Sequence, residues 1–144
     1  MRQNLTSFLG LITLASVLTG QQAIASTVTL EGTNWKLSQW TGTELVEDTE
    51  ISAAFTAGNL AGSSGCNRYV TRYQKEEDNM AVQSEISSTM KACPEAWMKQ
   101  EASFLAALKG VQQYGITKEG KLQLVYRLPE GFGILTFMSE NLKK

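Results

Sequence analysis

The segment PEAWMKQEASFLAALKG, residues 94–110, decides the fold because it is the one stretch with a convincing helical pattern. Pro94 suits the first helical position, where its missing N–H is no loss, and Gly110 suits the end of the helix. The apolar residues lie at i, i+7, i+8 and i+11, on one face of a helix. They are Trp97, Phe104, Leu105 and Leu108. The sequence therefore predicts one helix with its apolar stripe packed against a core.

The segments on both sides of this helix alternate between apolar and polar residues, which is typical of β-strands. Turn signals such as TKEG and LPEG separate them. The predicted strands are residues 33–40, 50–56, a short strand within 57–65, 66–74, 80–83, 111–116, 121–127 and 132–138. We therefore expect an α+β fold, in which an antiparallel sheet of about seven short strands is curled around or covered by the helix.

The N-terminal segment has the features of a secretory signal peptide. Arg2 supplies a positive charge, residues 8–18 are apolar, and Ala23-Ile24-Ala25 is a cleavage motif. The apolar run is shorter than the roughly 20 residues that a membrane span needs. Cleavage after residue 25 gives one domain, 26–144, with no cysteine at the cleavage point to carry a lipid. We expect a periplasmic or secreted bacterial protein, not lipid-anchored and without a transmembrane span after cleavage.

Composition argues against several classes of function. The chain has 13 Lys and Arg residues, 14 Asp and Glu residues and no histidine. The charges are interspersed, so nucleic acid is not an expected partner. The lack of histidine removes the commonest general base and the commonest metal ligand. We therefore expect no catalytic residues, no cofactor and no metal site.

The chain has two cysteines, Cys66 and Cys93, separated by 27 residues. An even number of cysteines in a secreted protein suggests a disulfide, which would stabilise a domain with such a loop by about 3–4 kcal/mol. A catalytic thiol would need a base, and a zinc site needs three or four ligands. Two reduced buried thiols, or a reactive pair, remain as alternatives.

Ser88-Thr89-Met90-Lys91 matches the S-x-x-K signature of penicillin-recognising serine enzymes, and Ser139-Glu140-Asn141 resembles their second element. The third element, K-T-G, is missing, and the chain is too short for that two-part fold. A small hydrolase or inhibitor that uses Ser88 and Lys91 is therefore only a remote alternative.

Glu101 lies within the apolar stripe of the predicted helix, four residues from both Trp97 and Leu105. A carboxylate in such a place must be hydrogen-bonded, paired with a charge or neutralised. One interpretation is structural: Glu101 is placed at the edge of the stripe, or is bonded to main-chain groups or to a tyrosine hydroxyl. The other interpretation is functional: Glu101 is a general acid or a ligand-binding group. The lack of a catalytic partner favours the structural interpretation.

Three segments together carry a resemblance to a known family. The segment around the first cysteine reads G-C-N-x-Y, residues 65–69, and the segment around the second reads T-M-x-A-C-P-x-x-x-M-x-x-E, residues 89–101. With the opening G-T-x-W-x-L, residues 32–37, they span nearly the whole predicted domain. In these features the sequence resembles the META / HslJ-like domain family.

The resemblance implies a small antiparallel, partly barrel-like β-sheet with one packed α-helix. The family has no catalytic residue set, so its recurrent residues imply a folding signature. One departure is Thr71, because the family often has glycine there, which would suggest a bulge. In this chain the signature residues are Trp35, Gly65, Asn67, Tyr69, Thr89, Met90, Pro94 and Glu101.

Relatives in this family are associated with heat shock, novobiocin resistance, the outer membrane, secretion and motility. The resemblance therefore implies a non-enzymatic protein of the envelope stress response that acts by binding or structural support. We expect this protein to be a monomer. An alternative is a pilot-like or chaperone-like module that binds lipid or an outer-membrane protein. The expected partner is an envelope protein or an apolar ligand.

Overall fold

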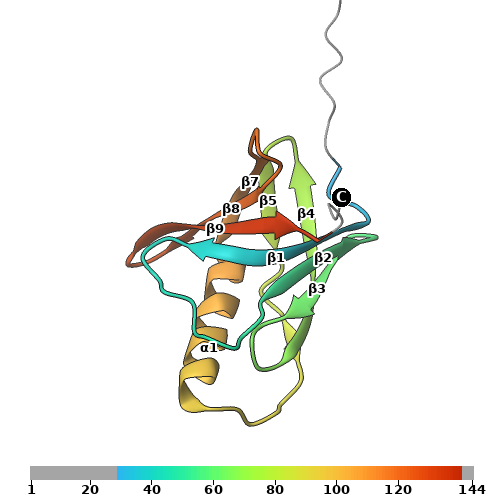
Figure 1. Ribbon diagram of the computed structural model, residues 1–144. Helices are drawn as coiled ribbons and strands as arrows, with labels where there is room; N and C mark the ends of the chain where they lie inside the picture. Colours follow the sequence, from blue (N-terminus) through green and yellow to red (C-terminus); the bar gives the residue numbers. More distant parts are fainter. Residues whose placement is uncertain (1–28, 141–144) are drawn as a thin grey trace, which may run out of the picture.

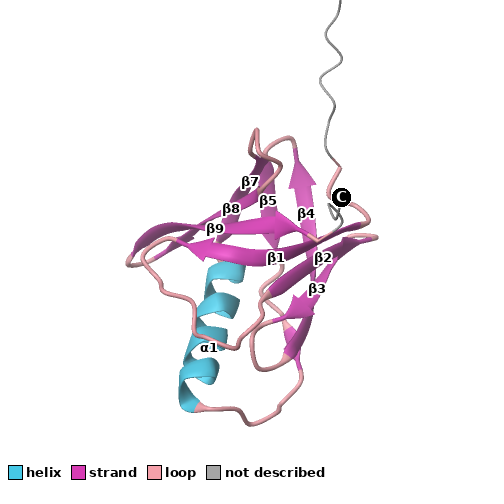
Figure 2. Ribbon diagram, viewed as in Figure 1, coloured by secondary structure: helices cyan, strands magenta, loops and turns pink. Residues whose placement is uncertain are grey.

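The computed structural model describes residues 29–140 (Figure 1), so the predicted signal peptide lies outside the described residues. Within that range, nine strands and one helix follow one another along the chain (Figure 2). They are β1 (Thr33–Trp40), β2 (Ser52–Thr56), β3 (Asn59–Ser63), β4 (Arg68–Glu76), β5 (Asn79–Val82), β6 (Ser87–Ser88), α1 (Glu95–Lys109), β7 (Val111–Ile116), β8 (Leu122–Leu128) and β9 (Gly131–Ser139).

Eight of the strands form a closed antiparallel barrel. Their order is β3-β2-β1-β9-β8-β7-β5-β4, and a further pairing of β3 with β4 closes the ring. The ninth strand, β6, pairs with β4 at Tyr69 and Val70, whereas β5 pairs with the later residues 73–76 of β4. The α+β class is confirmed, but the prediction of about seven strands in a partly barrel-like sheet was wrong. Two-residue β6 is too short to show alternation, and the barrel also needs the pairing of β1 with β9, which lie near opposite ends of the described chain.

Alternation along the strands separates the core from the surface. On β4, the side chains of Tyr69, Thr71 and Tyr73 are buried, whereas those of the intervening residues are exposed. Since side chains alternate across a strand, one face of β4 points into the barrel. The barrel interior is filled by side chains that include Phe55, Leu60, Leu122, Leu124, Leu135 and Phe137, all fully buried.

Helix α1 covers one end of the barrel, with its C-terminal end against the strands (Figure 1). Phe104 is fully buried there, and its ring meets the rings of Trp40 and Tyr69 edge to face at 6.3 and 5.6 Å. Such aromatic pairs add about 0.5–1.5 kcal/mol each beyond the apolar area that they bury. The helix therefore acts as the lid of the hydrophobic core.

The predicted helix is confirmed and is one residue shorter at each end. Pro94 precedes the first turn and accepts hydrogen bonds at its carbonyl from the N–H groups of Trp97 and Met98. Gly110 ends the helix. A Cβ atom at this position would lie 2.4 Å from the carbonyl oxygen of Arg127, so a larger residue does not fit. In the described residues, no helix combines the length and the apolar character that a membrane crossing would need.

The face of the helix that is buried is rotated about the helix axis relative to the predicted apolar stripe. Phe104 and Leu108 are buried as expected, but Trp97 and Leu105 are half-buried. The other buried helix residues are Gln100 and Ala107. A polar residue at the centre of this face was not expected from its hydropathy.

Candidate functional site

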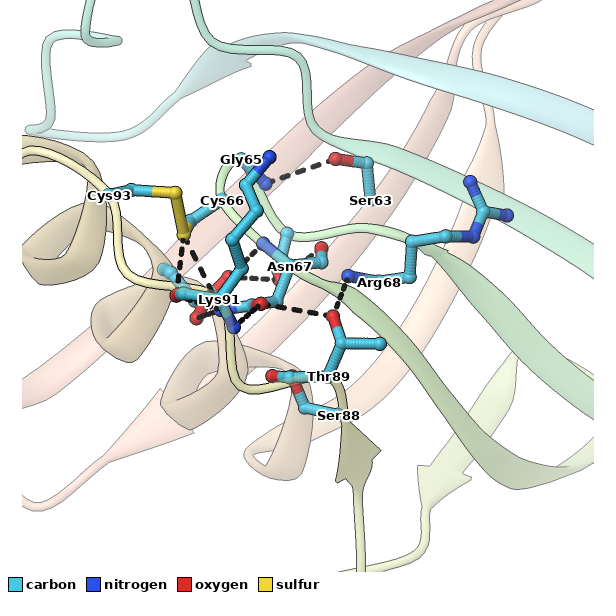
Figure 3. Close-up of a disulfide and its surroundings, with 11 residues drawn as sticks. Ser63, Gly65, Cys66, Asn67, Arg68, Ser88, Thr89, Lys91 and Cys93 are labelled. Carbon is cyan, nitrogen blue, oxygen red and sulfur yellow. Dashed lines mark hydrogen bonds between the residues drawn. A yellow bond between two sulfur atoms is a disulfide. The ribbon is translucent and has the colours of Figure 1, made fainter.

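Most of the signature residues meet where the start of β4 lies beside α1 and the segment that precedes it. Figure 3 shows Gly65, Asn67 and Thr89 of this set around the two cysteines. Cys66 and Cys93 form a disulfide there, with their Cα atoms 5.9 Å apart, and no free cysteine occurs in the described chain. The structure thus contains the predicted bridge instead of two thiols. It joins the bend before β4 to the segment before α1, because Cys93 directly precedes Pro94.

Asn67 is the centre of the hydrogen bonds around this bridge (Figure 3). Its side-chain oxygen accepts from the N–H of Lys91 at 2.7 Å and from the hydroxyl of Thr89 at 3.0 Å. Its side-chain nitrogen donates to Oε1 of Glu101 at 2.8 Å. The buried amide therefore ties three segments together: the start of β4, residues 89–91 and the helix.

Glu101 accepts hydrogen bonds at both carboxylate oxygens. Besides the Asn67 amide, its Oε2 atom accepts from the N–H of Asn67 at 2.7 Å and from the hydroxyl of Ser64. Burial by itself would raise the pKa of Glu101, but donors on Ser64, Asn67 and the main chain of Cys66 outweigh burial and lower the pKa. The ionised carboxylate thus accepts hydrogen bonds from the bend before β4 and links that bend to the helix.

This arrangement predicts an acid-sensitive stability. The folded-state pKa of Glu101 lies below its ordinary value of 4.5, so its stabilisation is present above that value and is lost as pH falls through the folded pKa. We expect the free energy of unfolding to fall more in wild type than in Glu101→Gln when the pH is lowered from about 6 to about 3.5. Urea unfolding at the two pH values measures this. Parallel losses in the two proteins would contradict the assignment.

A glycine makes the bend before β4 possible. Gly65 has φ +106°, a conformation that residues with a side chain rarely adopt. The bend is closed by the N–H of Ser64, which donates to the carbonyl of Asn67 at 2.8 Å. It turns the N–H of Asn67 toward the helix carboxylate. Gly65 therefore shapes the site through the main chain.

Two signature residues, Tyr69 and Trp35, lie in other parts of the fold. Tyr69 is buried inside the barrel and its hydroxyl donates to the carbonyl of Ser52 at 2.9 Å. Trp35 lies on β1, where its ring nitrogen donates to the hydroxyl of Thr33 at 2.7 Å. These two residues belong to the core and lie outside the place where β4 and α1 meet.

We call the set Ser64, Cys66, Asn67, Thr89, Cys93 and Glu101 the clamp. Its cysteines are bonded to each other, and its carboxylate and amide are hydrogen-bonded to neighbouring protein groups. In the described part of the chain, no group of three or more cysteines, aspartates and glutamates could hold a metal ion. The clamp is therefore built to hold the chain together.

Met90 differs from the other signature residues because its side chain is 95% exposed. It lies at the rim of a groove of about 440 Å³ between residues 88–92 and α1. Met98 and Leu105 of the helix line the same groove. Met90 was expected to be a structural residue of the signature, but its side chain is not part of the buried core.

Ser88 and Lys91 are not joined as a catalytic pair would be. The hydroxyl of Ser88 donates to the carbonyl of Thr89 at 3.0 Å. The main chain of Lys91 binds Asn67, while its side chain is exposed. Among the residues that the structure describes, no hydrogen bond links the Ser88 hydroxyl to the Lys91 amine.

Thr71 stands where the family often has glycine. Its buried hydroxyl donates toward the carbonyl of Glu85, 3.1 Å away, and so ties the segment before β6 to β4. The register of β4 with β3 runs from Arg68 to Arg72 without a shift. The threonine thus replaces the suggested bulge with a regular strand and an added contact.

Gln100 is a structural residue that the sequence did not indicate. Its Oε1 atom accepts from the N–H of Val46 at 2.7 Å, and its nitrogen donates to the hydroxyl of Thr49 at 2.8 Å. The buried amide thereby fastens the loop between β1 and β2 to the helix. A glutamine on an otherwise apolar helix face is the signal that could have revealed it.

Replacing Gln100 with alanine is expected to lower the free energy of unfolding by about 1–2 kcal/mol, because the Val46 N–H loses its acceptor. Amide hydrogen exchange should rise most in residues 46–49. Gln112→Ala, which changes an exposed glutamine, is the matched control and should leave both quantities nearly unchanged. Unchanged exchange in this loop would show that Gln100 does not hold it.

Comparison with known proteins agrees with this architecture. The family model described as META domain matches residues 28–138. An NMR structure of a protein from Burkholderia xenovorans is 26% identical, with a TM-score of 0.63 over 78% of this chain and 84% of its own. A second NMR structure, 17% identical, has a TM-score of 0.62 over 81% of this chain and 99% of its own, and so shares the fold. Comparison with curated proteins gave no significant match. The chain belongs to the META domain family.

Proposed function

We propose that this protein is exported to the bacterial cell envelope and acts there as a non-enzymatic binding or supporting protein in the stress response. The observation that carries the proposal is the clamp, in which the amide, the carboxylate and both cysteines of the family signature bond to the protein itself. The disulfide leaves no thiolate to act as a nucleophile, and the carboxylate and the amide hold neighbouring parts of the chain in place. The domain's exposed apolar side chains are then its means of acting.

Two features support an extracytoplasmic location. Residues 1–25 have the composition of a signal peptide. The Cys66–Cys93 bridge is only half-buried, and disulfides persist mainly in oxidising compartments.

A pilot-like or chaperone-like role is the second candidate. It is favoured by large apolar side chains on the surface, among them Met90, Phe132 and Met138. Since the inward-facing side chains of the barrel are fully buried, a lipid or a protein partner would bind on the outside of this conformation.

Complementation of a deletion strain of the source bacterium tests the proposal. We expect deletion to lower survival under heat or novobiocin, and the full chain to restore it. The Ser88→Ala/Lys91→Ala double variant should restore survival equally, whereas residues 26–144 without the leader should not. If the deletion strain survived every envelope stress as well as the wild-type strain does, the proposed role in the stress response would be contradicted. Rescue without the leader would contradict the location, and failure of the double variant would favour the enzyme alternative.

A further inference from the structure

The groove between residues 88–92 and α1 has one wall of main chain and one wall of apolar side chains. On the helix side lie Met98, which is 43% exposed, and Leu105, which is half-buried. On the other side, residues 89–93 continue from β6 to Cys93 without regular secondary structure. Methionine side chains are flexible and polarisable, so they adapt to different apolar partners.

The main-chain wall is an open sheet edge. In the described residues β6 has a single neighbouring strand, β4. The N–H groups of Thr89 and Lys91 point back to β4, donating to the Arg68 carbonyl and to the Asn67 side chain. The main-chain groups of the intervening Met90 form no hydrogen bond in the part of the chain that the structure describes. Alternate residues thus leave main-chain donors and acceptors unused.

Such an edge beside a helix is suited to one kind of occupant. An extended polypeptide presents main-chain donors and acceptors at the strand spacing, and its alternate side chains can enter a neighbouring apolar pocket. A free acyl chain would supply no hydrogen bonds to the edge.

The charges around the edge add a preference. Lys91 lines the groove and its side chain is exposed, while the carboxylate of Glu101 is already bonded within the clamp. The unused charge at the groove is therefore positive, and acidic side chains on the peptide would complement it.

We propose that an extended segment of another protein, with alternating apolar side chains and acidic residues beside them, binds in this groove as an added strand on β6. Its apolar side chains lie on Met98 and Leu105, and Met90 covers them from the other side. The inference rests on the proposed binding function and names its partner as a polypeptide.

Peptide selection on the purified, oxidised domain tests this. Twelve-residue peptides from a displayed random library are selected on residues 26–144, and the dissociation constant of the best peptide is measured by fluorescence anisotropy. We expect Met98→Lys and Met90→Lys to raise it at least about tenfold, the loss of roughly one well-packed contact. Met138→Lys and Phe132→Lys replace exposed apolar residues outside the groove and should leave the dissociation constant unchanged.

A scan of N-methylated peptides separates strand addition from other modes of binding. If the peptide pairs with the β6 edge, N-methylation should abolish binding at every second residue and be tolerated at the residues between. Failure to select any peptide, insensitivity to Met98→Lys and Met90→Lys, or a loss of binding without this period would each overturn the proposal. The assay uses purified domain, so its failure is distinct from the failure of the survival test in the deletion strain.

Discussion

Replacing both Cys66 and Cys93 with alanine is expected to lower the free energy of unfolding by about 3–4 kcal/mol. The bridge closes a loop of 27 residues and so restricts the unfolded chain, and it also fixes the start of α1 to the start of β4. A domain has about 5–15 kcal/mol of stability in total, so the loss is large. Urea unfolding followed by tryptophan fluorescence measures it.

Reduced wild-type protein provides the control for this variant. Wild type in excess dithiothreitol should unfold at the same urea concentration as the variant, because both lack the bridge. If oxidised wild type and the double-alanine variant unfolded at the same concentration, the bridge would contribute nothing to the fold.

The second large effect is expected from Asn67→Ala, at about 2–4 kcal/mol of lost stability. The substitution removes the acceptor of the Lys91 N–H and of the Thr89 hydroxyl. It also removes one donor to the Glu101 carboxylate. Partly buried polar groups that lose their partners in this way destabilise the folded state by more than an average hydrogen bond contributes.

Two comparisons make the Asn67 result specific, with stability measured by urea unfolding in each case. Asn67→Asp keeps the acceptor oxygen but places a second carboxylate beside Glu101, so it should also destabilise the protein at neutral pH. Asn59→Ala changes an exposed asparagine on β3 and should stay within about 0.5 kcal/mol of wild type. A loss at Asn67 no larger than the loss at Asn59 would contradict the central position given to Asn67.

Local patterns in the sequence predicted the elements well. The first strand, 33–40, has the bounds of β1, and the alternation along 66–74 separates the buried from the exposed residues of β4. The helix was found by its spacing and by its terminal proline and glycine. Barrel closure could not be read in this way, because it depends on the pairing of β1 with β9 and of β5 with β7, which are not consecutive strands.

Individual residues of the clamp were predictable from the sequence, but the hydrogen bonds that connect them were not. Cysteine count indicated the bridge, and the place of Glu101 in an apolar stripe indicated a bonded carboxylate. Asn67 was identified only as a residue of the family signature, because its partners lie 22 to 34 residues away in sequence. The exposure of Met90 was not indicated, since hydropathy alone favours burial of methionine.

The most direct test of the clamp as one structural unit is a double-mutant cycle of Asn67→Ala and Glu101→Ala, measured by urea unfolding at neutral pH. Because the two side chains share a hydrogen-bond network, their effects should be coupled by more than about 1 kcal/mol, with the double variant less destabilised than the two single losses together. Losses that add to within about 0.3–0.5 kcal/mol would show two independent residues and would contradict the clamp.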